Sequence, residues 1–356
     1  MGRAVPRWIT WGGWPFVAFV CTTIYGQMVS VYQYPKPALL ILGGSTVAAV
    51  AVGLVYGRNK RVWCRYLCPV NGVFNLLAKL APLHYRVDGE LWRDSQRRHQ
   101  PVPAIVCAPL VPIRTMKGAG TCHMCGRCSG MRDAVTLAVR PPNHEIVSVA
   151  ANKSDPWQSA LILFGLMGVA FAAFDWPTSP WFVAAKQAIA EVLVDNGVMW
   201  PLELSAPWWV ATNYAERNDT LTLLDTGLIV GYITVVAALM GGLLSACLAL
   251  ANLALGRWSW PRFHHLAQAL IPMAGTGVFL GLSALTISLL RAEGVPTFWV
   301  GGARIAILAG AWIWSVWLGW RVAGLSAAGP RRVVAAAGLG LAAAVAVGGW
   351  AMLFFT

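Results

Sequence analysis

Three cysteines, each separated from the next by two residues, form the pattern with the clearest chemistry in this sequence. Cys122, Cys125 and Cys128 follow the spacing Cys-x2-Cys-x2-Cys, which is that of the first three ligands of a ferredoxin-type [4Fe–4S] cluster. With this spacing, one loop can bring three thiolates to three iron atoms. Paired Cys-x-x-Cys elements also bind structural zinc, but a third cysteine at the same interval favours iron and sulfur.

The fourth ligand has to come from another part of the chain. Bacterial ferredoxins continue the run with three residues and then Cys-Pro, whereas the corresponding position here is Arg132. Cys68, which precedes a proline, is the predicted fourth ligand. Cys64 and Cys107 then remain for a second cluster, but two all-cysteine cubanes need four thiolates each. The candidates for additional, non-cysteine ligands are His99, His123 and Asp133.

Basic residues surround these cysteines. A cubane held by four thiolates carries net negative charge, and neighbouring cations stabilise it. The same cations also suit a loop that meets anionic lipid, and the two interpretations are compatible. The residues concerned are Arg58, Lys60, Arg61, Arg65, Arg127 and Arg132.

The histidines argue against heme as the cofactor. A b-type heme in a helical bundle needs axial histidines at depth, and no histidine falls in the interior of a predicted span. No Cys-x-x-Cys-His attachment motif occurs, so we predict no heme. His264 and His265 are predicted to be interfacial, and contact with a quinone head group is the alternative. The six histidines are His84, His99, His123, His144, His264 and His265.

The elements that position these residues are mainly membrane spans. Of the 356 residues, 57% are hydrophobic and 12% are charged, against roughly 25% charged residues in an average soluble domain. Apolar runs near the roughly 20 residues needed to cross a bilayer recur along the chain. Cys21 and Cys247 fall inside such runs and are predicted to be packing residues. The runs are 9–32, 38–57, 157–174, 226–254, 266–290, 299–320 and 333–355.

Charge predicts how these spans are oriented. The net charge of +13 would suit nucleic acid, but fifteen of the 27 Lys and Arg residues, against six acids, lie within 58–156. That concentration is the positive-inside signature of a cytoplasmic loop, and it places the N-terminus in the cytoplasm as well. Residues 175–222 have six acids against two basic residues and are predicted to lie on the opposite side. There they form either a docking face for a partner or a solvated loop.

The predicted fold class is therefore an all-α integral membrane protein with about seven transmembrane helices. A cytoplasmic, ferredoxin-like iron–sulfur segment, 58–156, is inserted between the second and third helices. It follows a two-helix hairpin, 1–57, and precedes a five-helix domain, 157–356, with the extracytoplasmic loop 175–222. A segment of this size without a large core needs another source of stability, and metal coordination supplies it.

One stretch resembles a known family. Gly57-Arg58, followed by Val62-Trp63-Cys64-Arg65-Tyr66-Leu67-Cys68-Pro69-Val70-Asn71 and later by the Cys122 run, is similar to the membrane-bound polyferredoxins of the NapH/NosR/CcoG type. The resemblance covers roughly 38–150. It implies electron transfer at the bacterial cytoplasmic membrane between the quinone pool and a partner redox protein. Members usually carry a second Cys-x3-Cys-Pro, of which Cys107-Ala108-Pro109 is at best a remnant.

These observations predict a [4Fe–4S] electron-transfer subunit of a respiratory chain, embedded in the lipid bilayer and working with quinone, with other redox subunits or with an extracytoplasmic carrier. Two alternatives stay open. The first alternative is an assembly or maturation factor for a respiratory metalloenzyme, as in one branch of the family. The second is a transporter-like membrane scaffold with structural zinc. Transport paths usually show ionisable residues within the membrane, and Arg304 is the main such residue in the spans.

Overall fold

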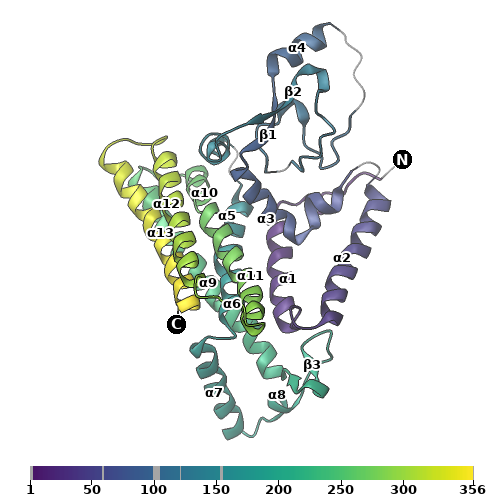
Figure 1. Ribbon diagram of the computed structural model, residues 1–356, viewed down its shortest axis with the longest axis vertical. Coiled ribbons are helices and arrows are strands. Elements are labelled where there is room, and N and C mark those ends of the chain that lie inside the picture. Colours follow the sequence, from purple (N-terminus) through teal and green to yellow (C-terminus); the bar gives the residue numbers. More distant parts are fainter. Residues whose placement is uncertain (1–2, 58–59, 99–104, 121, 153–154, 356) are drawn as a thin grey trace.

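The computed structural model describes residues 3–57, 60–98, 105–120, 122–152 and 155–355. Its helices form a bundle, with a segment containing strands at one end and short helices at the other (Figure 1). Six helices in the described part of the chain are long and apolar enough to cross a membrane. The protein is therefore a mostly helical, multi-pass membrane protein. The six are Pro35–Tyr56, Pro156–Asp175, Leu223–Ala254, Ile271–Ala292, Val300–Ala323 and Pro330–Phe355.

These six include α2 (Pro35–Tyr56), α9 (Leu223–Ala254), α11 (Ile271–Ala292), α12 (Val300–Ala323) and α13 (Pro330–Phe355). The span Pro156–Asp175 is composed of α5 (Pro156–Ala160), a π-helical stretch η7 (Leu161–Val169) and α6 (Ala170–Asp175). Outside the spans lie α3 (Pro69–Leu77), α4 (Gly89–Arg97), α7 (Pro180–Asp195), α8 (Trp200–Glu203) and α10 (Trp260–Gln268).

The helix in the predicted first span is shorter than the sequence suggests. α1 covers Trp14–Met28, which is 15 residues or about 22 Å of helix, against roughly 30 Å of hydrocarbon. Pro15 stands in its first turn, and Ser30, just beyond its end, adopts a left-handed φ of 48°. By length and composition, six helices in the described part of the chain can span the membrane. A seventh spanning helix, in the predicted first span, remains a prediction.

The predicted span 266–290 is divided into two helices. α10 ends at Gln268 and α11 begins at Ile271, with Pro272 in its first turn. A proline has no N–H to donate to the carbonyl four residues before it, so the helix cannot continue unbroken through this position. The membrane-length part, α11, falls inside the predicted range for most of its length.

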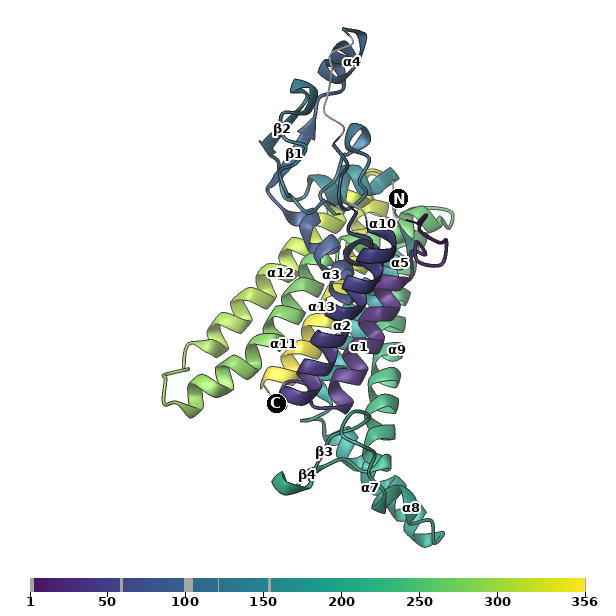
Figure 2. The same ribbon diagram turned by 90° about the vertical axis from the view of Figure 1, so that its right-hand side faces the viewer.

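The connections of opposite charge lie at opposite ends of the bundle. Strands β1 (Leu83–Val87) and β2 (Val135–Val139) lie with α4 and α10 at one end, whereas α7, α8 and the end of α13 lie at the other (Figures 1 and 2). At that second end, the Thr212 N–H donates to the Met28 carbonyl at 2.8 Å, and the hydroxyls of Ser30 and Thr212 are 2.7 Å apart. Short strands β3 (Asn213–Tyr214) and β4 (Asp219–Thr220) pair there. This arrangement agrees with the alternation predicted from charge.

The span Pro156–Asp175 forms the centre of the bundle and is largely buried. Its π-helical stretch packs against α9, where Gly168 permits close approach. A Cβ at Gly168 would lie 2.9 Å from the Ala237 carbonyl oxygen and 3.0 Å from the Ala237 Cα. Both are backbone atoms and cannot rotate away, so the two helices need glycine at this crossing.

Gly168→Ala is therefore expected to destabilise the fold by about 1–3 kcal/mol, the usual cost of overpacking a core. The measurement is the midpoint of thermal unfolding in detergent. Gly242→Ala is the matched control, because Gly242 lies on α9 and a Cβ added there would have no neighbouring atom within 4 Å. Equal midpoints for the two variants would contradict this description of the α9 contact.

The cysteine-bearing segment has only a small core of its own. β1 and β2 pair antiparallel, with Leu83 opposite Val139 and Val87 opposite Val135. In the small core beside them, Trp92, Ala134 and Val135 are buried. Such a core supplies little stability by itself. Other parts of the segment join the bundle, because Leu76, Ile146 and Val147 belong to its main hydrophobic core.

Candidate metal centre

Cys64 and Cys68 lie on either side of a helix boundary. Cys64 lies on η1 (Trp63–Leu67), a single π-helical turn, and is exposed. The Cys68 N–H donates to the Trp63 carbonyl at 3.0 Å, which closes that turn. Cys68 is then the N-cap of α3, with Pro69 as the first helical residue, a position that suits proline because no N–H is needed there. The Cys-x3-Cys-Pro sequence thus presents one thiol from a turn and one from a helix start.

The second group of cysteines lies on a loop that turns sharply. Met124 and Gly126 both have left-handed φ values, 50° and 79°. The Met124 N–H donates to the Cys122 Sγ at 3.4 Å. Further on, the Ser129 N–H donates to the Gly126 carbonyl at 2.9 Å. The loop therefore turns back on the Cys122 sulfur and is held by its own backbone.

The cysteines of the loop are electrostatic neighbours of Cys107. Burial raises the pKa of the Cys122 thiol, with smaller raising contributions from Cys107 and Cys125 and an opposing one from the Met124 N–H. Burial likewise raises the pKa of the Cys128 thiol, and the charge of Cys122 raises it further. Cys128 also packs against the small core beside the strands.

Backbone contacts and charge link these four cysteines to the Cys64 segment. The Arg61 N–H donates to the Ala108 carbonyl, next to Cys107, at 2.7 Å. Burial and then the charges of Arg61 and Arg65 lower the pKa of His123. Arg61 and Ala108 also line one cavity with Cys125. The structure thus brings both cysteine groups to one region between the bundle and the strands.

An open cavity of about 500 Å³ lies in this region beside Cys125. Lys60, Arg61 and Arg127 line it. This places three of the predicted cations next to a predicted ligand, and the negative charge of thiolates would be offset there. The glycines Gly53 and Gly57, at the end of α2, complete the wall with Ala108.

The donor set fits an iron–sulfur cluster in chemistry. All eight cysteines are free thiols, and six of them are at this end of the bundle, with a hydrogen-bonded sulfur and cationic side chains nearby. Among the residues that the structure describes, no three His, Cys, Asp or Glu side chains are close enough together to hold a single metal ion. The thiols are therefore neighbours rather than a closed ligand set, and the ligand assignment remains a prediction. Two predicted residues, Arg58 and His99, lie outside the described ranges.

A buried carboxylate that the sequence motifs did not indicate holds the start of the Cys122 loop. Glu145 is only 4% exposed. Its carboxylate accepts the Ala119 N–H at 2.6 Å and the Gly120 N–H at 3.1 Å, and it pairs with Arg140 at 2.8 Å. Any side chain at Gly118 would collide with the same carboxylate. The sequence signal for this contact is the pair Gly118 and Gly120 before the cysteine run, since both glycines lie against the Glu145 carboxylate.

A second buried polar group links this segment to the bundle. The Lys79 ammonium is buried and donates to the side-chain oxygens of Gln158 and Gln268, both at 2.5 Å. Burial lowers the pKa of Lys79 to about 8, against the opposing charges of Glu145 and Asp155. His265, predicted to be interfacial with quinone contact as the alternative, is 2.8 Å from the Ile146 carbonyl. No local pattern in the sequence indicates that these residues meet.

The match to a known family covers the stretch that contains Cys64 and Cys68. Residues 40–87 match the family model described as a 4Fe-4S binding domain. This stretch runs from α2 through Cys64, Cys68 and α3 to the end of β1. These residues are therefore similar in sequence to a 4Fe-4S binding domain. The Cys122 run lies beyond the matched residues, so its part in ligation stays a prediction.

A curated relative points to the same chemistry. The chain is 28% identical over 132 residues to the "Putative electron transport protein YccM" of Escherichia coli (strain K12), which is 35% of each protein. The chain thus matches about a third of that relative's length. No solved structure matches the chain. Iron–sulfur binding and electron transport are therefore supported, and the finer features of the polyferredoxin resemblance remain expectations.

Proposed function

We propose that this protein is a membrane iron–sulfur electron-transfer subunit, which passes electrons between the quinone pool and a partner redox protein of a bacterial respiratory chain. The observation that carries the proposal is the approach of the Cys64 segment to the segments of Cys107 and Cys125 at one end of a multi-span bundle, through the Arg61–Ala108 hydrogen bond and a shared cavity. The match to a 4Fe-4S binding domain supports it. Under the proposal this end faces the cytoplasm.

The ligands in this proposal are Cys122, Cys125, Cys128 and Cys68, with Cys64 and Cys107 serving a second site. A [4Fe–4S] cluster, when bound by such thiolates, supplies reversible one-electron transfer. The chain's own residues hold the thiols and set their surroundings. Lys60, Arg61 and Arg127 offset negative charge beside Cys125, and the Met124 N–H stabilises the Cys122 sulfur.

Placement at the bundle end gives the site access to both electron partners. Cys64 and Cys125 are exposed, which leaves them accessible to a partner protein, while α3 carries the Cys68 segment onto the bundle. Both reactions then occur on one face, so electrons need not cross roughly 30 Å of hydrocarbon.

The test is electron exchange with quinone in lipid nanodiscs. Protein purified without oxygen and reduced with dithionite, then freed of the reductant, should lose its low-temperature EPR signal when decylubiquinone is added. The Cys68→Ser variant should give no comparable signal at the start. A reduced signal that decylubiquinone leaves unchanged, together with loss of metal from a client enzyme in a deletion strain, would favour the maturation role and contradict this one.

A further inference from the structure

Two neighbouring cavities lie where the cysteine-bearing segment meets the bundle. One has a volume of about 260 Å³ and the other about 230 Å³, and Arg65 and Gln158 line both of them. Each is smaller than the roughly 300 Å³ at which ligand pockets begin, so a ligand of the usual size would extend over both. No part of the proposed metal centre occupies them, since none of the six cysteines is among their lining residues.

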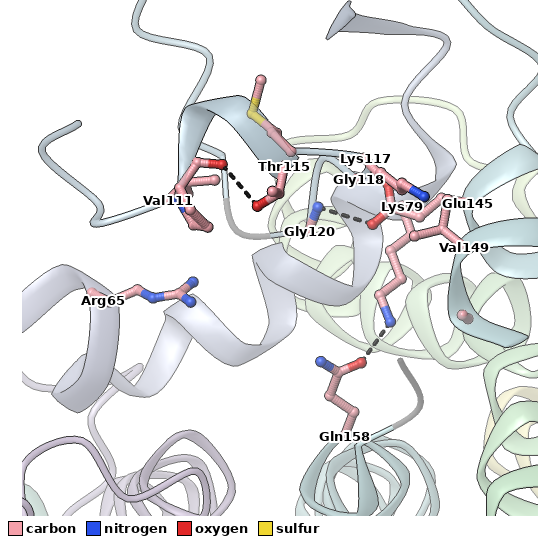
Figure 3. A pocket seen from close by; sticks show the side chains of 13 residues that line it. Arg65, Lys79, Val111, Thr115, Lys117, Gly118, Gly120, Glu145, Val149 and Gln158 are labelled. Carbon is pink, nitrogen blue, oxygen red and sulfur yellow. Dashed lines mark hydrogen bonds between the residues drawn. The ribbon is translucent and has the colours of Figure 1, made fainter. Parts of the chain in front are cut away.

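The first cavity has several cationic side chains in its wall. Lys79, Lys117 and Arg65 line it together with Glu145 (Figure 3). The charge of Glu145 is already matched by Arg140 at 2.8 Å. The cavity therefore presents N–H donors in excess, which suits a ligand that accepts hydrogen bonds through oxygen.

Lys79 is the best-positioned of these donors. Its side chain is held by Gln158 and Gln268, so its position is fixed before any ligand arrives. An ammonium has three N–H donors, and the two glutamines use two of them. The third is available to a ligand oxygen in the cavity that Lys79 lines. Gln158 also contributes its side chain to the same wall, as Figure 3 shows.

The second cavity lies at the start of a membrane span and has a mixed lining. Trp11, Pro15, Trp157 and Leu161 line it, together with polar residues that include Asn75 and Asp155. The rings of Trp11 and Trp157 pack edge to face with centroids 4.8 Å apart. Trp157 and Leu161 are among the first residues of the span Pro156–Asp175, so this cavity lies at the level where the bilayer interface is expected.

We propose that the two cavities form the binding site for a quinone ring, with Lys79 and Gln158 together at one ring oxygen and the Trp11–Trp157 side receiving the isoprenoid chain. This rests on the proposed function and gives it a location. A ligand with acceptor oxygens on a flat ring and an apolar tail matches a site with donors at one end and aromatic side chains at the other. A phospholipid head group shares the acceptor oxygens, and the experiment separates the two.

The site adjoins both cysteine groups along the chain. Arg65 directly follows Cys64, and Gly120 stands two residues before Cys122. A ring held at Arg65, Lys79 and Gln158 therefore lies against the segments that carry the proposed ligands. That placement is the one an electron exchange with the cysteine region requires.

The experiment measures binding rather than turnover. The full chain, purified with its iron, is placed in nanodiscs and titrated with decylubiquinone, and an azido-quinone is photo-crosslinked and mapped by peptide mass spectrometry. Lys79→Met should weaken decylubiquinone binding about tenfold or more, the loss expected for one charge-assisted hydrogen bond. Trp11→Ala, at an exposed position, should weaken it severalfold. The crosslink should map to the peptide around Trp157 or Trp11.

Lys36→Met is the matched control, because Lys36 is an exposed lysine in the first turn of α2 and lines neither cavity. Its binding constant and iron content should equal those of the parent protein. Unchanged binding in both Lys79→Met and Trp11→Ala, with crosslinks elsewhere, would overturn the site. So would native mass spectrometry that shows a phospholipid lost on Lys79→Met while decylubiquinone binds as before.

Failure of this site and failure of the proposed function are distinguishable. If iron content and the EPR signal are intact but Lys79→Met binds quinone normally, only the location is wrong. If the parent protein contains no iron, the electron-transfer role fails whatever its affinity for quinone.

Discussion

Protein carrying Cys68→Ser is expected to lose about four iron atoms per chain, the content of one cubane, together with the corresponding EPR signal. Cys68 is the predicted fourth ligand of the Cys122, Cys125 and Cys128 site. It also lies in the stretch that matches a 4Fe-4S binding domain. A serine hydroxyl is a much poorer ligand than a thiolate for iron–sulfur clusters, so the site should not assemble. Iron quantification on protein purified without oxygen measures the loss.

Cys122→Ser should have the same effect if the two cysteine groups hold one cluster between them. Cys21→Ser is the control, since Cys21 is an exposed thiol of α1 outside both groups, and its iron content should match the parent protein. If Cys68→Ser removes iron while Cys122→Ser leaves it unchanged, the two groups do not share a cluster, and the predicted ligand set is wrong.

The second large effect is expected from Glu145→Gln. Removing the charge leaves the Arg140 guanidinium without its ion-pair partner in a site where both side chains are nearly buried. Breaking one partner of a buried pair usually costs about 3–5 kcal/mol. The amide also offers only one oxygen to the two N–H groups of Ala119 and Gly120, which the carboxylate now satisfies with both oxygens. The thermal unfolding midpoint should fall clearly.

The same change should reduce iron content, because Ala119 and Gly120 lead directly into the loop of Cys122. Asp94→Asn is the matched control. Asp94 belongs to the same segment, but its pair with Arg97 is long, at 3.7 Å, and largely exposed, and such surface pairs contribute about 0–1 kcal/mol. A Glu145→Gln protein as stable as Asp94→Asn, with full iron content, would show that the carboxylate does not hold the loop.

Most of the spanning architecture could be predicted from the sequence because its signals are local. Long apolar runs identify α2, α9, α12 and α13 to within a few residues, since a bilayer requires roughly 20 apolar residues wherever a helix crosses it. The alternation of basic and acidic connections likewise predicts which loops share an end of the bundle. The observed helix bounds differ from the predicted ones near Pro272, which stands in the first turn of α11, and near Ser30, which lies just beyond the end of α1.

The candidate ligands have a signature in the sequence, whereas the residues that support them have none. Cysteine spacing predicts Cys122, Cys125 and Cys128, and a Cys-Pro pair predicts Cys68, because cluster chemistry fixes both residue type and interval; this ligand set stays a prediction. Glu145 and Lys79 have no such signature. Each contacts a residue that is distant in the sequence. Lys79, for example, is 189 residues from Gln268, and such a contact can be recognised only when the three-dimensional structure is known.

The central claim, that this membrane protein holds a [4Fe–4S] cluster at one end of its helical bundle, is tested most directly by iron and acid-labile sulfide quantification with low-temperature EPR on the full chain purified without oxygen. We predict about four iron and four sulfide per chain or more, with an EPR signal that appears on reduction by dithionite. Protein that contains zinc, with no iron, no sulfide and no signal, would contradict the account.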